Sequence, residues 1–185
     1  SITYTLTEEN ELEIEYKAFT NEATIVNLTH HSYFNLEGQH GSVLEQELQI
    51  NATQVLATKA MIPTGELLPV QDTEWDYTNL KSCPEAIDTT FAVNTKETLV
   101  ATLLSKENNL KMEVFTNQPG LHVYVGGNCF NQIKGKENAS YHSQSGICFE
   151  TQNFPDAPNH SNFPSAILLP GDIYFHKTIY KFQSF

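Results

Sequence analysis

The sequence predicts an all-β domain made mostly of antiparallel strands. Polar and apolar residues alternate strictly over 11–19, the pattern of a strand with one buried and one solvent-facing side. The same alternation recurs later in the chain, and turn residues separate the alternating segments at irregular intervals. Helical periodicity is nearly absent, with 76–80 as the best candidate for a short helical turn. Short antiparallel strands joined by turns indicate a sandwich or a barrel.

The first half of the chain begins with a predicted hairpin. Residues 1–7 alternate, and the polar residues 8–10 provide the turn into 11–19. The further elements expected in this half are strands at 23–28, just before two adjacent histidines, and at 46–50, and a connection containing Pro and Gly at 62–65.

The second half is predicted to contain another hairpin, with strands at 98–104 and 110–115 and a turn between them. Residues 121–125 alternate before two glycines, which indicate a bulge or a close backbone approach. The remaining strands are expected at 147–149, 166–169 and 172–182. No shift in composition indicates a linker, so we interpret residues 1–185 as a single unit.

The charge of the chain is strongly unbalanced, with 22 acidic and 10 basic residues and a formal net charge of −12. A field of this sign repels nucleic acids and anionic membrane surfaces, so we expect neither as a partner. No cluster of basic residues offers a pocket for a polyphosphate, whereas a neutral small molecule is indifferent to the charge. The 185 residues and the 39% apolar content suffice for one folded domain with a core.

The three cysteines, Cys83, Cys129 and Cys148, are odd in number and widely spaced. No Cys-x-x-Cys pair is present, so the pattern indicates neither a zinc knuckle nor a disulfide framework. Reduced thiols, the absence of a signal peptide and the lack of an apolar run long enough to span a bilayer together predict a cytoplasmic protein.

Two polar segments contain the residue types of a general acid and a general base. Glu150 ends an apolar β-type run and precedes a loop at 153–159 that is stiffened by proline. His31 can hold or release a proton near neutral pH, so the two form a candidate acid–base couple. Taken alone, each residue could also have no catalytic role: Glu150 as a surface carboxylate, and His31 as a surface histidine or one that forms structural hydrogen bonds. The aromatic residues expected to wall a sugar ring are Tyr33, Phe34, Phe149 and Phe154.

Three further residues are candidates for substrate contacts. Asp88 interrupts an apolar strand start, and a turn or cap aspartate is the alternative. His122 is out of phase with its apolar neighbours on an alternating strand. Gln152 is two residues from Glu150, so their side chains share one face of a strand. Asp88 and Gln152 are expected to border the same hollow as the acid–base couple.

A bound metal is the main alternative for a set of His, Asp and Glu residues. The adjacent His30 and His31 point to opposite faces of a strand, so both cannot easily bind one ion. No His-Glu-x-x-His, calcium-loop pattern or closely spaced carboxylate cluster is present, and no Gly-x-Ser-x-Gly supports nucleophilic catalysis. We therefore expect neither a metal nor an organic cofactor.

Several motifs resemble those of one known family. Residues 29–36, Thr-His-His-Ser-Tyr-Phe-Asn-Leu, are similar to its Thr-Asn-His-Ser-Tyr-Phe-Asn-Leu. Residues 150–157 are similar to its Glu-Thr-Gln-Asn-aromatic-Pro-Asp-Ala signature. The remaining matches are Asn159, Phe163-Pro164, 118–120 with Val123-Tyr124 and Gly127-Asn128, 170–172 and 180–182. The match is collinear over nearly the whole chain, which resembles the aldose 1-epimerase, or galactose mutarotase, family.

The resemblance implies a galactose mutarotase-like β-supersandwich, present as a partial domain. It also implies interconversion of the α and β anomers of free aldohexoses such as glucose or galactose. By position, His31 matches the family's acid, which protonates the ring oxygen, and Glu150 its base, which takes the proton of the anomeric hydroxyl. Asp88 matches a residue that binds sugar hydroxyls, and His122 occupies a position that contacts sugar.

The chain departs from the family pattern in three ways. Thr89 stands where the family has His, and His122 stands where Gln is common. The chain also corresponds to the C-terminal half of a longer fold, whose N-terminal half carries an Arg and a His of the sugar site. We therefore expect the missing N-terminal half as a partner, and an open sheet edge or exposed core side chains near the first hairpin.

The sequence leaves two other functions open, a hexose-phosphate epimerase and a non-catalytic carbohydrate-binding β-sandwich. The lack of a basic cluster argues against the first. The presence of both His31 and Glu150 argues against the second, because binding alone needs no acid–base couple. The sugar preference and a homodimer are also left open.

Overall fold

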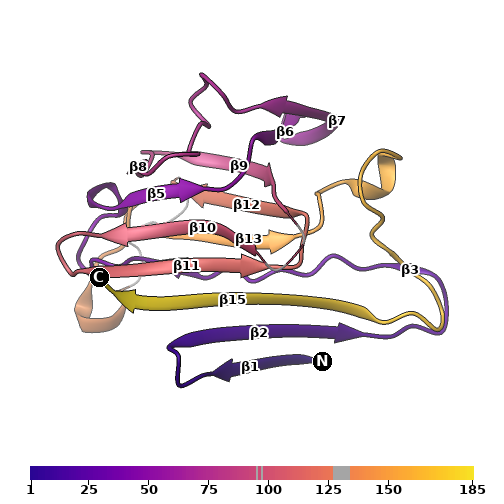
Figure 1. Ribbon diagram of the computed structural model, residues 1–185, viewed down its shortest axis with the longest axis horizontal. Coiled ribbons are helices and arrows are strands. Elements are labelled where there is room, and N and C mark those ends of the chain that lie inside the picture. The colour runs from indigo at the N-terminus through magenta and orange to yellow at the C-terminus, as the bar shows by residue number, and fades with distance from the viewer. Residues whose placement is uncertain (95, 97, 127–133) are drawn as a thin grey trace.

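The computed structural model describes residues 1–94, 96, 98–126 and 134–185, which fold into antiparallel sheets (Figure 1). One sheet has seven strands, in the order β1 (Ile2–Leu6), β2 (Glu11–Ala18), β15 (Tyr174–Ser184), β11 (Leu110–Thr116), β10 (Thr98–Ser105), β5 (Glu47–Ile50) and β8 (Lys81–Ser82). The second has six, in the order β4 (Tyr33–Phe34), β13 (Ile147–Gln152), β12 (Gly120–Val125), β9 (Ile87–Ala92), β6 (Gln54–Lys59) and β7 (Ile62–Pro69). The all-β, antiparallel fold class predicted from the sequence is confirmed.

The remaining elements are short. Strands β14 (Ile167–Leu168) and β3 (Thr24–Ile25) pair with each other. The helical elements described are the 3-10 turns η1 (Val43–Glu45), η2 (Lys136–Asn138) and η3 (Ala157–Asn159). Among the described residues, no helix has the length and apolar character needed to cross a membrane.

The core lies between the two large sheets, because alternate residues of each sheet turn toward the other. The seven-stranded sheet contributes Ile14, Leu103 and Met112, and the six-stranded sheet contributes Phe91 and Leu121; all five are fully buried. The other face of the six-stranded sheet is therefore free to carry polar side chains, and the candidate site lies on it.

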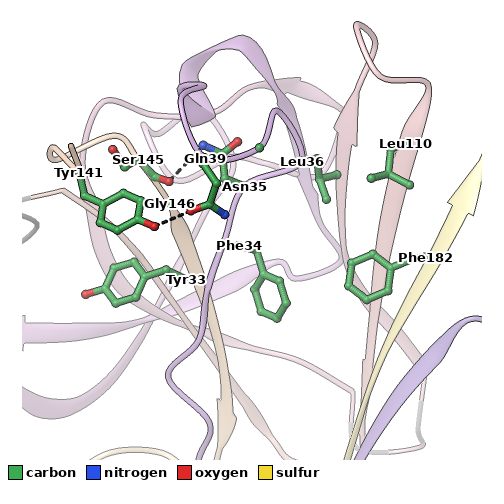
Figure 2. Close-up of a pocket in the computed structure, with 11 residues that line it drawn as sticks. Tyr33, Phe34, Asn35, Leu36, Gln39, Leu110, Tyr141, Ser145, Gly146 and Phe182 are labelled. Atoms are coloured by element: carbon green, nitrogen blue, oxygen red, sulfur yellow. Dashed lines mark hydrogen bonds between the residues drawn. The ribbon is translucent and has the colours of Figure 1, made fainter. Parts of the chain in front are cut away.

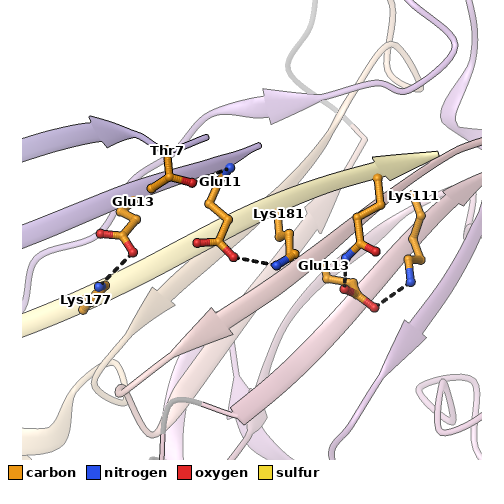
Figure 3. Close-up of polar contacts among 8 residues, drawn as sticks. Thr7, Glu11, Glu13, Lys111, Glu113, Lys177 and Lys181 are labelled. Carbon is orange, nitrogen blue, oxygen red and sulfur yellow. Dashed lines mark hydrogen bonds and ion pairs between the residues drawn. The ribbon is translucent and has the colours of Figure 1, made fainter. Parts of the chain in front are cut away.

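The outer face of the seven-stranded sheet carries cross-strand ion pairs (Figure 3). On β15, Nζ of Lys177 lies 3.0 Å from Oε1 of Glu13, and Nζ of Lys181 lies 2.7 Å from Oε1 of Glu11. Both glutamates belong to β2, whose strict alternation was the first signal in the sequence. The alternation in β2 therefore corresponds to apolar residues that face the core and charged residues that form ion pairs on the outer face.

The first hairpin leaves an apolar row uncovered. Ile2, Tyr4 and Leu6 of β1 are exposed, although the cross-strand partners of the first two, Tyr16 and Ile14, are buried in the core. Opposed residues of an antiparallel pair point to the same face, so the row continues the core face beyond the area that the second sheet covers. This is the exposed apolar surface expected at the first hairpin, and β1 also leaves one sheet edge open.

Two local expectations are wrong. Residues 76–80 are irregular, with a bend at 78–79 and no helical turn, and Oδ1 of Asp76 accepts the backbone N–H of Thr78. Residues 62–65 are not a connection, because β7 runs through Pro63 and Gly65 as the edge strand of its sheet. An edge strand tolerates proline, since part of its N–H row needs no ladder partner. The Gly127-Asn128 motif and Cys129 lie outside the described residues.

Candidate active site

Four neighbouring strands, in the order β4-β13-β12-β9, bring the candidate residues together. Glu150 of β13 lies opposite His122 of β12, which lies opposite Thr90 of β9. Two residues further along β12, Tyr124 lies opposite Asp88. Residues opposed in this way share a face of the sheet, and this face, called here the site face, is turned away from the core.

Side-chain hydrogen bonds hold the segment before β4 against β13. Nδ2 of Asn27 donates to the carbonyl oxygen of Asn153 at 3.0 Å, and Oδ1 of Asn27 accepts the Asn153 N–H at 2.8 Å. Two residues on, the hydroxyl of Thr29 donates to the carbonyl oxygen of Thr151 at 2.9 Å. This spacing of two matches the period of a strand, so the next residue in the series, His31, arrives at the site face.

The imidazole of His31 lies against the carboxylate of Glu150, with Nε2 3.3 Å from Oε1. The Glu150 side chain is 9% exposed and the His31 side chain 53%, so the carboxylate lies at the bottom of the site and the imidazole at its mouth. Tyr33 and Tyr124 flank the imidazole, with ring centroids 5.3 and 6.3 Å from it. Such a couple can exchange protons with a small polar molecule.

The environment of Glu150 favours its action as a base. Burial raises the pKa of the Glu150 carboxyl above its usual value, and the nearby charge of Asp88 adds to the rise. The imidazoles of His122 and His31 act in the opposite direction on the same pKa. A carboxylate with a raised pKa takes a proton from a hydroxyl group more readily than an exposed one does.

His122 uses both ring nitrogens on protein partners. Its Nε2 lies 3.0 Å from Oδ1 of Asp88, and its Nδ1 lies 2.9 Å from the hydroxyl oxygen of Thr90. The neutral tautomer with its proton on Nε2 satisfies both, donating to the carboxylate and accepting from the hydroxyl. His122 therefore orients Asp88, whose side chain is partly exposed on the site face. Thr90 has no motif of its own, and its alternation with Asp88 is the one signal that places it there.

Gln152 lies on the site face of β13, two residues beyond Glu150, and is partly exposed. Its cross-strand partner on β12 is Gly120. A Cβ at Gly120 would come within 2.9 Å of the carbonyl oxygen of Gln152 and 3.3 Å of the methyl group of Thr90. A glycine at this position is therefore what allows the strands beneath the site to pack this closely.

Two of the four expected aromatic walls are wrong, and Tyr33 is the one that lies against His31. Phe34 and Phe149 pack against each other on the core side, because each is adjacent in its strand to a site-facing residue. Phe154 lies on the site face over Gly120, in a small apolar cluster packed against Ala92. Tyr124 supplies the second aromatic ring beside His31; it belongs to one of the matched motifs, but it was not among the residues expected to wall the sugar.

A mainly apolar hollow of about 710 Å³ opens beside β4 (Figure 2). The residues that line it include Tyr33, Phe34, Leu110, Tyr141 and Phe182. Neither His31 nor Glu150 is among its lining residues, and no acidic or basic side chain is either. The hollow has no carboxylate or imidazole among its lining residues to form an acid–base couple, so the candidate active site is the polar cluster on the site face.

The fold is that of the galactose mutarotase-like class. The chain superimposes on the GalM/aldose epimerase homologue from C. elegans with a TM-score of 0.89 at 26% identity, covering 99% of this chain and 59% of that chain. The galactose 1-epimerase from Lactobacillus acidophilus superimposes with a TM-score of 0.82 at 28% identity, over 99% of this chain and 56% of that chain.

The family model for aldose 1-epimerase matches residues 1–181, and the chain belongs to this family. The galactose mutarotase of Homo sapiens is 39% identical over 195 residues, which cover 98% of this chain and 56% of the human protein. The aldose 1-epimerase of Escherichia coli K12 is 29% identical, over 98% of this chain and 58% of the bacterial protein. The chain thus spans a little over half the length of the curated relatives that it matches.

Proposed function

We propose that this chain is the C-terminal part of an aldose 1-epimerase, an isomerase that interconverts the α and β anomers of free hexoses such as glucose and galactose. The observation that carries the proposal is the contact between His31 and Glu150, 3.3 Å apart on the site face. Membership of the aldose 1-epimerase family supports it.

In the proposed reaction, protonated His31 gives a proton from Nε2 to the ring oxygen, and Glu150 takes the proton of the anomeric hydroxyl. The bond between C1 and the ring oxygen breaks, and an open-chain aldehyde forms. Rotation about the C1–C2 bond turns the other face of the carbonyl group to the ring-closing hydroxyl. On closure the protons return, so the next cycle starts from the same protonation states. No metal or organic cofactor takes part in this scheme.

The substrate-binding roles fall to Asp88, His122 and Gln152. The partly exposed carboxylate of Asp88 accepts hydrogen bonds from sugar hydroxyls, and the contact of 3.0 Å from His122 keeps it in place. Gln152 presents an amide, both donor and acceptor, to the same face. Aromatic contact with the sugar comes from Tyr33 and Tyr124, which flank the imidazole of His31.

The chain is also proposed to need the rest of its fold. The exposed row of Ile2, Tyr4 and Leu6 extends the core face of the seven-stranded sheet, and the missing N-terminal half is the proposed cover. The same half would supply the remaining wall of the sugar site. A homodimer that covers the row is the competing arrangement, and sedimentation of the complete protein distinguishes the two. The proposed location is the cytoplasm, supported by the buried free thiol of Cys83.

The alternative functions have less support. A hexose phosphate would bring its negative charge close to Asp88 and Glu150, and no lysine lies among the site-face residues described above. A binding module has no use for a histidine held against a buried carboxylate.

Polarimetry tests the proposed function. Freshly dissolved α-D-glucose and α-D-galactose are followed with the 185-residue chain and with a polypeptide that also carries the N-terminal half of the fold. The longer polypeptide is expected to accelerate mutarotation above the rate in buffer, and the shorter chain to be nearly inactive. No acceleration by the longer polypeptide with either sugar, or with other free aldoses, contradicts the proposal.

A further inference from the structure

A thiol lies beside the acid–base couple. Cys148 is two residues before Glu150 on β13, so its side chain shares the site face, and it is fully buried. Its Sγ, a ring nitrogen of His31 and a carboxylate oxygen of Glu150 all lie within 4.8 Å of one another. Within the described ranges, this is the one cluster of three His, Cys, Asp or Glu side chains close enough to hold an ion.

The donor atoms match the preferences of zinc, which binds imidazole, thiolate and carboxylate groups tetrahedrally. Two ligand atoms that are each ~2.1 Å from a tetrahedral ion lie about 3.4 Å apart. Nε2 of His31 and Oε1 of Glu150 are already 3.3 Å apart. A sulfur ~2.3 Å from the same ion lies about 3.6 Å from the other ligands, so Sγ of Cys148, within 4.8 Å of both, needs to approach by at most about 1.2 Å.

The charges and the access route also suit a divalent ion. A thiolate, a carboxylate and a neutral imidazole neutralise Zn²⁺, which makes a buried ion far less costly. The His31 side chain is 53% exposed and the Glu150 side chain 9%, so an ion can enter at the imidazole and reach the two buried ligands. The three protein ligands leave the fourth position for water.

We propose that His31, Cys148 and Glu150 form a binding site for zinc or a similar thiophilic divalent ion, and that this ion inhibits the epimerase. On binding, the Cys148 thiol releases its proton to solvent and bonds form from sulfur, nitrogen and oxygen to the metal. The ion occupies the His31 nitrogen and the Glu150 oxygen that otherwise transfer protons. The binding step stands on the geometry alone, whereas the inhibition rests on the proposed function.

Cobalt(II) is the probe for the binding step, because it takes the place of zinc and is coloured. The 185-residue chain, kept reduced with a phosphine, is titrated with CoCl₂. We expect one equivalent to give a thiolate-to-cobalt charge-transfer band in the near ultraviolet and the intense visible bands of a four-coordinate ion. One equivalent of ZnCl₂ should then remove both, because zinc binds this type of site more tightly than cobalt does.

Variants assign the ligands. Cys148→Ser should lose the charge-transfer band, whereas Cys83→Ser and Cys129→Ser should keep it. His31→Asn, at an exposed side chain, and Glu150→Gln should weaken cobalt affinity at least about tenfold, the loss that removal of even an outer-shell partner can cause. Circular dichroism of each variant checks that the sheets are intact. A band that is absent, that survives in Cys148→Ser, or that is unchanged in His31→Asn and Glu150→Gln overturns the site.

The inhibition is measured on active enzyme, with each variant compared with its own rate in the presence of a chelator. Zinc should raise the KM for the sugar, since ion and sugar compete for the same two side chains, and Cys148→Ser should show at least about a tenfold weaker zinc effect. If cobalt binds as described but zinc leaves the rate of active enzyme unchanged, the inhibition is wrong and the binding site stands. If no sugar is epimerised, the proposed function fails, and the cobalt spectra still decide the site.

Discussion

The hydroxyl of Thr29 donates a hydrogen bond of 2.9 Å to the carbonyl oxygen of Thr151. Thr29 is two residues before the proposed acid, His31, and Thr151 is one residue after the proposed base, Glu150. This bond and the two hydrogen bonds between Asn27 and Asn153 connect the segment to its neighbour through side chains. Elsewhere in the sheet, backbone hydrogen bonds make this connection. The segment that carries His31 is thereby held in register with β13, although it is not a strand itself.

Thr29→Val removes this hydrogen bond and keeps the shape of the side chain. In polypeptide that carries activity, we expect kcat to fall roughly ten- to a hundredfold, since a displacement of about 1 Å between reacting groups has that effect. Stability should fall by only about 1 kcal/mol. Thr29→Ser, which restores the hydroxyl, is the matched control and should recover most of the rate. Equal rates for the two variants would remove Thr29 from the positioning of His31.

Glu150→Gln keeps the size of the side chain and removes the base. We expect kcat for mutarotation to fall about a hundredfold or more, the usual range for loss of a general base, and His31→Asn to act similarly. Rates are corrected for spontaneous mutarotation in buffer, which sets the floor. His40→Asn, at an exposed histidine away from the site face, is the control and should retain the full rate. A Glu150→Gln enzyme as fast as the parent excludes the proposed mechanism.

His176 predicts a loss of stability in acid. The ring is fully buried, stacked on Tyr16 at 4.6 Å between centroids, and its Nε2 lies 2.9 Å from the hydroxyls of Thr151 and Thr178. Burial lowers the pKa of His176 to about 4 in the folded chain. An unfolded histidine titrates near pH ~6.5, so the unfolded chain gains a proton that the folded chain refuses.

The contribution of His176 is therefore fully present above about pH 6.5 and is lost as the pH falls through about 4, with a total of roughly 3 kcal/mol. Denaturant unfolding at pH 7, 5.5 and 4.5 measures it. Carboxylates titrate in the same range, so the quantity to compare is the difference between the parent and His176→Gln at each pH. That difference should shrink toward low pH, whereas the difference between the parent and His40→Asn should not. A constant difference for His176→Gln would contradict the prediction.

Gly120→Ala tests the close packing beneath the site. The added methyl group meets the Gln152 carbonyl oxygen at 2.9 Å and the Thr90 methyl group at 3.3 Å, so the strands must separate. We expect a loss of about 1–3 kcal/mol of unfolding free energy, the typical cost of overpacking. Gly120→Val should be worse in proportion to its volume. Unchanged denaturation midpoints for both variants would show that a side chain fits at position 120 and would contradict the close packing of β12 and β13.

Lys177→Met tests the ion pairs on the outer sheet face. Its Nζ lies 3.0 Å from Glu13, but the pair is partly solvated, so we expect a loss of no more than about 1 kcal/mol. The loss should shrink in 1 M salt, where the screening length is about 3 Å. Ile14→Ala, at a fully buried position, is the contrasting variant and should cost ~2–5 kcal/mol at any salt concentration. A Lys177→Met effect that is large and insensitive to salt would point to packing of the lysine stem instead.

Alternation predicted the strand faces well, because a period of two is a local property of the chain. It placed Gln152 on the face of Glu150 and His122 on the face opposite to its apolar neighbours, and it predicted the antiparallel character of the sheets. The same rule, applied to Phe34 and Phe149, directs them to the core, because nearness to a polar motif along the chain does not mean nearness in space. Residues next to each other on a strand point apart, which is why the prediction that these two wall the sugar was wrong.

What could not be predicted depends on register between distant segments. That Thr90 supports His122, or that Tyr124 joins Tyr33 beside His31, follows from the register in which β9, β12 and β13 pair. The passage of β7 through Pro63 and Gly65 likewise depends on its place at the sheet edge. The roles of His31, Glu150, Asp88, His122 and Gln152 stay predictions until the rates above are measured.

The position of β15 has a consequence for how the chain is made. This strand lies between β2 and β11, so residues as far apart as Glu11 and Lys181 are joined across neighbouring strands. During synthesis, β2 has no partner on its inner edge until β15 leaves the ribosome. The seven-stranded sheet is therefore completed only after Tyr174–Ser184 has been made, and contacts of such long sequence separation are slow to form. Nascent chains stopped before Tyr174 should remain sensitive to protease, because the seven-stranded sheet is incomplete without the eleven residues of β15.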